Sequence, residues 1–400
     1  MIAALIFLAT YVVIALGRVP GLRLDRAGAA LLGASLMVAS NTLSLEEAYR
    51  AIDLDTITLL LGMMILVANL RFAGFFALAN AWIARRARHP LGLLAGIALV
   101  SGGLSAFLVN DTVCLMLTPL VAELTLGLGR NPVPYLLALA MASNIGSTAT
   151  ITGNPQNIMI GSFSHIPYGE FARALAPVAA AGLVVVLVLV ALAWRREFFT
   201  RAALEGTPAW PRFNRALLAK SLAVAAGMVL FFFLGQPPAK VAIVGGALLL
   251  LTRRVKPARV YAEIDWSLLL MFCGLFVVVA GMERALIGPA VLAEAERLDL
   301  GAPAVMAAVA AVLSNLVSNV PAVLVLKPFV QGLASPHLAW LSLAMASTLA
   351  GNLTILGSVA NLIVVQRAER NGIAIGFWDY FKLGAPVTVI TIVIGVMLLR

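Results

Sequence analysis

Two segments of the chain, residues 141–164 and 345–368, carry the same pattern of small and amide residues at a constant offset. Both open with Met-Ala-Ser, and Gly153 and Asn157 in the first are matched by Gly357 and Asn361 in the second. Each pattern lies inside an apolar run of roughly thirty residues, long enough for one tilted or interrupted span. Unwound backbone at membrane depth survives only where protein or a cavity surrounds it, and its carbonyls and half-helix ends can hold a cation or an anion.

These segments supply most of the residues that we predict to bind a cation or substrate: Asn144, Ser147, Thr148, Thr152, Gly153, Asn154 and Asn157, with Asn352, Thr354, Gly357, Ser358 and Asn361. The alternative is that small residues here serve close helix packing, with Ser, Thr and Asn bonding across helices. Two copies, each partnered by a broken apolar run, favour binding. The second copy has Ser358-Val359 where the first has Asn154-Pro155, which predicts a gentler break and an asymmetric site.

The run at 91–128 is long enough for two passes but is interrupted by Asn110-Asp111-Thr112, which predicts a re-entrant helical hairpin. Its counterpart at 302–333 breaks at 318–321. An acid inside the membrane is a functional hypothesis by default. Asp111 is a candidate sodium ligand or proton acceptor, and the alternative is an N-cap for the second hairpin helix. The hairpin residues that we add to the predicted site are Ser105, Asn110, Asp111, Thr112, Ser314, Ser318 and Asn319.

Lys327 is a second charge in an apolar setting, eight residues past Asn319. Three explanations stay open: it attracts an anion toward the site, it pairs with Asp111, or its stem lets the ammonium group reach the outer interface. The histidines occur singly near span ends, so no metal site is predicted beyond a sodium site.

The elements that position these residues belong to a membrane protein, because the 400 residues are 62% hydrophobic and 12% charged. The first apolar run, with no cleavage site after it, is predicted to be a retained span. The net charge of +10 is spread over short loops, as membrane topology requires, which argues against nucleic-acid binding. No nucleotide-binding loop, catalytic set or cofactor motif occurs, so we predict no enzyme and no cofactor.

The distribution of basic residues predicts the topology, since cytoplasmic loops carry the Lys and Arg excess. An outside N-terminus with both hairpins re-entrant places most of the 28 basic residues inside, among them Arg18, Arg23, Arg26, Arg71 and Arg130. The acidic stretches 46–55 and 294–299 then fall outside. The second half runs opposite to the first, which predicts an inverted repeat of five spans and one hairpin per half.

The predicted all-α architecture divides as follows. Residues 1–200 form the first repeat, with its hairpin at about 91–128 and its broken helix at about 132–164. Residues 201–220 form a cytoplasmic linker. Residues 221–400 form the second repeat, with its hairpin at about 302–333 and its broken helix at about 337–366.

At these residues the sequence resembles the ion transporter superfamily of divalent anion/sodium symporters, arsenite permeases, sodium/proton antiporters and the P protein, and looks like a citrate-transporter-like permease. The matching motifs lie at 108–112 with 118–119, 144–157, 318–321 and 351–361. The resemblance implies an elevator-type transporter fold, a homodimer, and a site at the hairpin tips and broken-helix loops. Both tips read Ser-Asn-Thr in the dicarboxylate symporters. Here the first reads Asn110-Asp111-Thr112, which looks closer to the arsenite permease and antiporter branch.

We therefore predict a secondary active transporter in the bacterial inner membrane that moves a small anion or oxyanion coupled to sodium or protons. The alternative is a sodium/proton antiporter that uses Asp111. The expected partners of the predicted anion transporter are the anionic substrate, membrane lipid and a second copy of the chain.

Overall fold

The computed structural model describes residues 2–16, 24–200, 204, 210–286 and 298–399, and within these ranges the regular elements are all helices, without a strand. The predicted all-α membrane architecture is confirmed at this level. Within these ranges, six helices are long and apolar enough to cross a bilayer. They are α4 (Leu54–Ala73), α6 (Pro90–Phe107), α10 (Tyr168–Ala193), α12 (Arg215–Phe233), α15 (Trp266–Leu286) and α21 (Phe377–Leu398).

Shorter elements complete the chain. Four are apolar helices of 13 to 15 residues: α1 (Ile2–Leu16), α2 (Arg26–Ala39), α13 (Pro238–Leu250) and α17 (Pro303–Val317). The inner pieces are α7 (Asn110–Gly127), α8 (Pro132–Ser147), η1 (Ile151–Gly153), α9 (Pro155–Ser164), α18 (Asn319–Gln331), α19 (Pro336–Leu349), η2 (Ala350–Asn352), η3 (Ile355–Gly357) and α20 (Val359–Arg370). The sequence patterns did not predict α3 (Leu45–Ala51), α5 (Phe75–Arg86), α11 (Arg195–Phe198) and α14 (Pro257–Tyr261).

Several predicted boundaries are corrected. The first hairpin breaks at residues 108–109 rather than at 110–112, because Asn110, Asp111 and Thr112 form the first turn of α7. The second breaks at Ser318 alone, and Pro321 lies in the first turn of α18, where its missing N–H is no loss. In the predicted linker 201–220, residues 201–203 and 205–209 lie outside the described ranges, and the residues from Arg215 onward belong to α12. Arg18, Arg23 and residues 294–297 also lie outside the described ranges.

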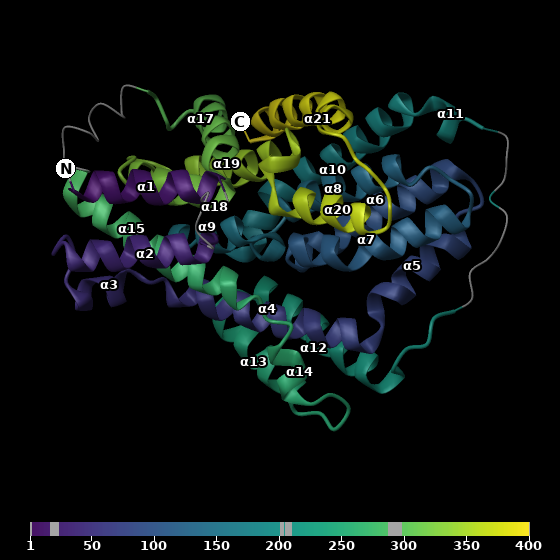
Figure 1. The fold of residues 1–400 in the computed structure, drawn as a ribbon, viewed down its shortest axis with the longest axis horizontal. Helices are drawn as coiled ribbons and strands as arrows, with labels where there is room; N and C mark the ends of the chain where they lie inside the picture. Colours follow the sequence, from purple (N-terminus) through teal and green to yellow (C-terminus); the bar gives the residue numbers. More distant parts are fainter. Residues whose placement is uncertain (1, 17–23, 201–203, 205–209, 287–297, 400) are drawn as a thin grey trace.

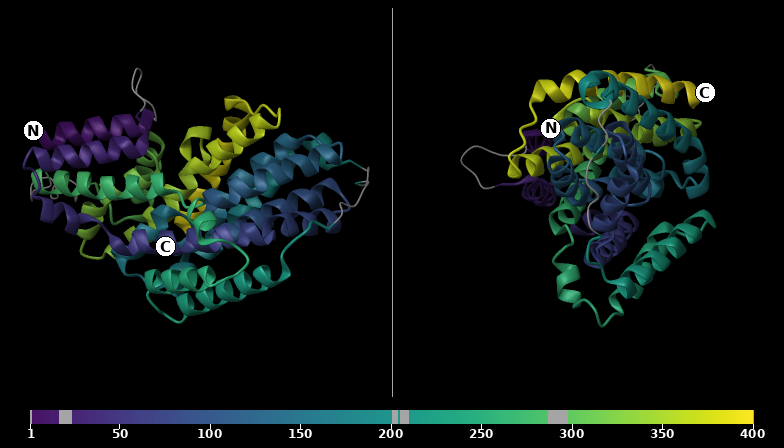
Figure 2. Two further views of the ribbon diagram at one scale, coloured as in Figure 1. Left: turned by 60° about the horizontal axis from the view of Figure 1, so that its bottom comes forward. Right: turned by 90° about the vertical axis from the view of Figure 1, so that its right-hand side faces the viewer.

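The helices gather in two groups around the centre of the molecule (Figure 1). At one end α1, α2 and α15 pack side by side, and α4 leads from there to α12 and α13, which run along one side (Figure 2). At the other end α6, α7, α8 and α10 pack together, with α19, α20 and α21 beside them. Helix α4 packs on α13, and α2 packs on α15. Each of these two contacts therefore joins one helix from the first half of the chain to one from the second half.

A glycine lies at each of these two contacts, Gly62 in α4 and Gly274 in α15. A Cβ on Gly62 of α4 would lie 2.4 Å from the backbone of Ala242 in α13. A Cβ on Gly274 of α15 would lie 2.5 Å from the backbone of Ala30 in α2. The side chain is therefore excluded at both crossings, which lets the helix backbones touch.

The duplicated segments form the centre of the fold. Residues 134–160 and 339–352 are buried without exception, whereas α10, α12, α13 and α21 carry large exposed apolar side chains. Lipid rather than water is the fitting environment for those outer faces. The chain is thus an integral, multi-pass membrane protein whose repeated polar motifs lie in its interior.

Candidate functional site

Both central helices are unwound at equivalent places. Helix α8 ends at Ser147 and α9 begins at Pro155, while α19 ends at Leu349 and α20 begins at Val359. The extended residues Thr150 and Thr354 have φ/ψ of −141°/166° and −136°/167°. Asn154 and Ser358 have −155°/164° and −145°/143°. The prediction of a gentler break in the second copy is therefore wrong.

The two breaks match because the same asparagine closes each of them. Asn157 donates from Nδ2 to the carbonyl oxygens of Ser147 and Thr150, both at 3.1 Å. Asn361 donates to the carbonyl oxygens of Gly351 (2.7 Å) and Thr354 (3.0 Å). Both asparagines are fully buried, so they satisfy carbonyls that unwinding has released. Asparagine rather than proline sets the shape of the break.

Asn144 of α8 connects the first half of the chain to the second. Its Nδ2 donates to Oδ1 of Asn352 and to Oδ1 of Asn361, each at 2.9 Å. Its Oδ1 accepts from Asn110 Nδ2 and from Ser358 Oγ, each at 3.0 Å. All the bonding capacity of this amide is used within the protein. Asn144 therefore supports the site rather than offering a free group to a ligand.

Thr348 occupies the position in α19 that corresponds to Asn144 and makes the reciprocal contacts. Its hydroxyl accepts from Asn154 Nδ2 (3.1 Å) and from Gln156 Nε2 (3.2 Å). Neither Thr348 nor Gln156 was among the predicted site residues. The alignment of the two repeats contained the signal for Thr348, since it stands opposite Asn144.

The hairpin tips are fixed to the unwound segments. Asn110 reaches Asn144, as described, and Ser105 Oγ lies 2.7 Å from Ser143 Oγ. With its amide nitrogen directed at the second break, Asn319 donates to the carbonyl oxygens of Ser347 (3.1 Å) and Gly357 (3.3 Å). The tip of each hairpin therefore packs against one of the two broken helices.

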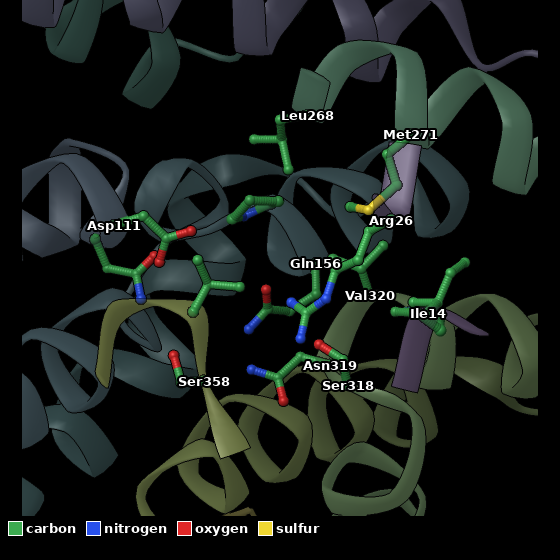
Figure 3. Close-up of a pocket in the computed structure, with 14 residues that line it drawn as sticks. Ile14, Arg26, Asp111, Gln156, Leu268, Met271, Ser318, Asn319, Val320 and Ser358 are labelled. Atoms are coloured by element: carbon green, nitrogen blue, oxygen red, sulfur yellow. The ribbon is translucent and has the colours of Figure 1, made fainter. Parts of the chain in front are cut away.

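A cavity lies where the two tips and the starts of α9 and α20 converge (Figure 3). Five predicted residues line it: Asn110, Asp111, Ser318, Asn319 and Ser358. The lining also includes Arg26 and Gln156, which were not predicted as site residues, and the apolar side chains of Ile14, Leu268 and Met271. The charge count placed Arg26 in a cytoplasmic loop, whereas it is the first residue of α2.

The other predicted residues do not line this cavity. Asn144, Ser147, Asn154, Asn157, Asn352 and Asn361 lie in the hydrogen-bond network behind it. Thr152 bonds instead to the Tyr168 hydroxyl at 2.8 Å. The rest of the predicted set, which is not part of the cavity lining, consists of Ser105, Thr112, Thr148, Gly153, Ser314, Thr354 and Gly357.

Asp111 is the acid of the cavity. The residue that caps α7 is Val109, which makes no side-chain cap bond, so the prediction of Asp111 as an N-cap is wrong. Within the described ranges no residue gives the Asp111 carboxylate a hydrogen bond or an ion pair. A half-buried carboxylate without such partners is suited to a cation or a proton.

Lys327 lies elsewhere. Its Nζ is 3.5 Å from Glu283 Oε1 of α15 and 5.0 Å from the ring centre of Phe163 in α9. The predicted alternative in which Lys327 pairs with Asp111 is therefore wrong. Because Glu283 balances its charge and it does not line the cavity, the structure offers no support for Lys327 as an anion-attracting group.

Ser318 has a backbone conformation that glycine prefers, with φ 78° and ψ 159°. Holding a non-glycine residue there costs about 1–3 kcal/mol. We expect Ser318→Gly to be about 1 kcal/mol more stable than Ser318→Ala, since glycine removes the strain but adds some chain entropy to the unfolded state. Thermal unfolding of both variants in detergent measures this difference. Equal melting temperatures would mean that the tip is not strained.

Comparison with known proteins places the chain among transporters. Residues 11–350 match the citrate transporter family. The silicon efflux transporter LSI3 of Oryza sativa subsp. japonica is 31% identical over 95% of this chain and 93% of its own length. An uncharacterized transporter of Mycobacterium tuberculosis is 31% identical over 100% of this chain and 98% of its own. The crystal structure of the Alcanivorax borkumensis YdaH transporter shares the fold, with a TM-score of 0.62 at 15% identity, over 100% of this chain and 96% of that one.

Proposed function

Because this chain belongs to the citrate transporter family, we propose that it is a secondary active transporter for a small anion or oxyanion, coupled to sodium or protons. The family confirms the resemblance noted in the sequence, and the transporters among the relatives support membrane transport as the activity. The observation that carries the proposal is the central cavity, where an unpaired carboxylate at Asp111 lies beside hydroxyl and amide groups from both hairpin tips. A coupling ion and a substrate would share this space, and no other cofactor is needed.

The proposed topology has the N-terminus outside and the second half inverted relative to the first. Its support is that four ion pairs join residues that this topology places on the same side of the membrane. The cytoplasmic pairs are Arg71–Glu263 and Arg130–Glu197, and the outer pairs are Arg284–Glu47 and His337–Glu170. A pair with members on opposite sides of the bilayer would contradict the topology.

We also propose an elevator-type mechanism. The cavity has apolar walls from α1 and α15, which belong to one packing group. Its polar walls come from the hairpin tips and broken helices, which pack on α8 and α19 of the other group. Movement of the second group along the first would carry the bound ions with the tips while the apolar walls stay behind. The homodimer and the bacterial inner membrane are part of the same proposal.

A sodium/proton antiporter is the second candidate, and the unpaired Asp111 specifically favours it. A single carboxylate can bind a sodium ion or a proton in turn but not both, which is the requirement for exchange. In that case the cavity would hold no anion.

A thermal-shift screen of the purified protein distinguishes the two. We would test citrate, phosphate and arsenate, each with and without sodium or lithium, over a range of pH. A ligand that binds only the folded state at 100 times its Kd stabilises it by about 2.7 kcal/mol. Stabilisation by an anion supports the symporter. If sodium stabilises in a pH-dependent way and no anion does, the anion proposal is abandoned in favour of exchange.

A further inference from the structure

Arg26 is the basic residue of the central cavity. It follows the N-cap Asp25, whose carboxylate accepts from the Gly28 N–H at 2.8 Å, and this cap fixes the start of α2 beside the cavity. The Arg26 side chain is half-buried and lines the cavity. Figure 3 shows its guanidinium group directed toward Gln156 and Asn319, with Asp111 at the other end.

Among the described residues, the Arg26 guanidinium has no fixed partner. Over the described part of the chain, no residue forms a hydrogen bond or an ion pair with the Arg26 side chain, and Asp111 lies beyond ion-pair distance. Arginine stays charged, so the cost of partial burial is not relieved by losing a proton. Its planar set of N–H donors matches a carboxylate or an oxyanion, which two parallel hydrogen bonds can hold. The cavity therefore has a cation-binding end at Asp111 and an anion-binding end at Arg26.

The two ends come from different groups of helices. Arg26 belongs to α2, which packs against α1 and α15. Asp111, Ser318 and Asn319 belong to the hairpins. An anion between Arg26 and the second tip would therefore bridge the two groups, and this bridge exists only while the tips lie next to the start of α2.

We propose that Arg26 is the anion-recognition residue of this site, so that the substrate is a carboxylate or oxyanion with at least one full negative charge. Arg26 binds that charge together with the Ser318 hydroxyl, while the coupling cation binds at Asp111. This inference rests on the proposed function and deepens it, since it excludes an uncharged hydroxy acid as the preferred substrate.

The test measures binding to the purified wild-type protein and to Arg26→Ala and Arg26→Lys. The probes are citrate, phosphate, arsenate and orthosilicic acid, the last of which is uncharged near pH 7. For the anion that binds the wild type, we expect Arg26→Ala to raise Kd about ten- to a hundredfold, the loss typical of a hydrogen-bonded charge. Arg26→Lys should have a smaller effect because it keeps the charge but not the paired donors.

Arg50→Ala is the matched control, because Arg50 is exposed and its ion pair is with Glu46 on the same surface helix. Melting temperatures without ligand check that each variant is folded. If an anion binds the wild type and Arg26→Ala equally well, the inference about Arg26 is wrong but the proposed function stands. If orthosilicic acid binds the wild type as tightly as the best anion, and Arg26→Ala does not weaken the binding of orthosilicic acid, the requirement for a charged substrate is wrong. If the wild type binds no anion, the proposed function itself fails.

Discussion

Replacing Asp111 with Asn should remove the dependence of transport on the cation gradient while leaving the protein folded. The side chain keeps its size, and no described residue bonds to the carboxylate, so no internal contact is lost. The cavity would lose the negative charge that holds a cation. In proteoliposomes we expect gradient-driven uptake to fall at least about tenfold, which corresponds to about 1.4 kcal/mol of lost cation binding.

The same substitution separates the two candidate functions. A symporter should retain weak anion uptake that no longer responds to sodium or pH, whereas an antiporter should lose exchange completely. Glu46→Gln is a suitable control, since it removes a carboxylate from an exposed surface pair that contributes little. Unchanged ion dependence in Asp111→Asn would show that the cation binds elsewhere.

The sequence predicted the central elements because their signals are local. Apolar runs gave the helices, and the repeated Gly and Asn positions located both unwound segments. Asp111 was recognised because an acid inside an apolar run is costly wherever it lies. Short or amphipathic helices such as α5 contain no long apolar run, so the sequence patterns did not predict them.

Side-chain partners were harder to predict, since they depend on which distant elements meet. In the sequence Arg26 resembles the other arginines of the predicted loops. Its place in the cavity follows only from the position of the start of α2 beside the hairpin tips. The sequence left three explanations open for Lys327, because nothing near it in sequence indicates its partner Glu283, forty-four residues earlier. Asn154-Pro155 predicted a sharper break than Ser358-Val359. The two loops nevertheless have the same shape, because Asn157 and Asn361 make equivalent hydrogen bonds in them.

The largest effect on stability is expected at Gly153, in the unwound segment between α8 and α9. A Cβ on Gly153 would lie 2.1 Å from the carbonyl oxygen of Ser147 and 2.7 Å from its carbonyl carbon, which are backbone atoms at the end of α8. Gly153→Ala must therefore push the loop away from α8, against the bonds from Asn157 and through a region in which every residue is buried. We expect Gly153→Ala to lower the free energy of unfolding by about 3 kcal/mol, which is at the upper end of the usual cost of overpacking a core.

Two further glycines make this prediction specific to the close contact. Gly103→Ala in α6 should be neutral or slightly stabilising, because a Cβ there meets nothing within 4 Å and alanine favours a helix by up to about 1 kcal/mol. Gly357→Ala should fall between them, since its Cβ would lie 2.8 Å from the Gly351 oxygen and 3.0 Å from the Asn315 side chain, which can move. Thermal unfolding of the three variants in detergent gives their order, and ligand binding by Gly153→Ala gives its consequence for the site. If Gly153→Ala were as stable as Gly103→Ala, the loop would not be held against α8, and the broken helix would then be free to change shape during transport.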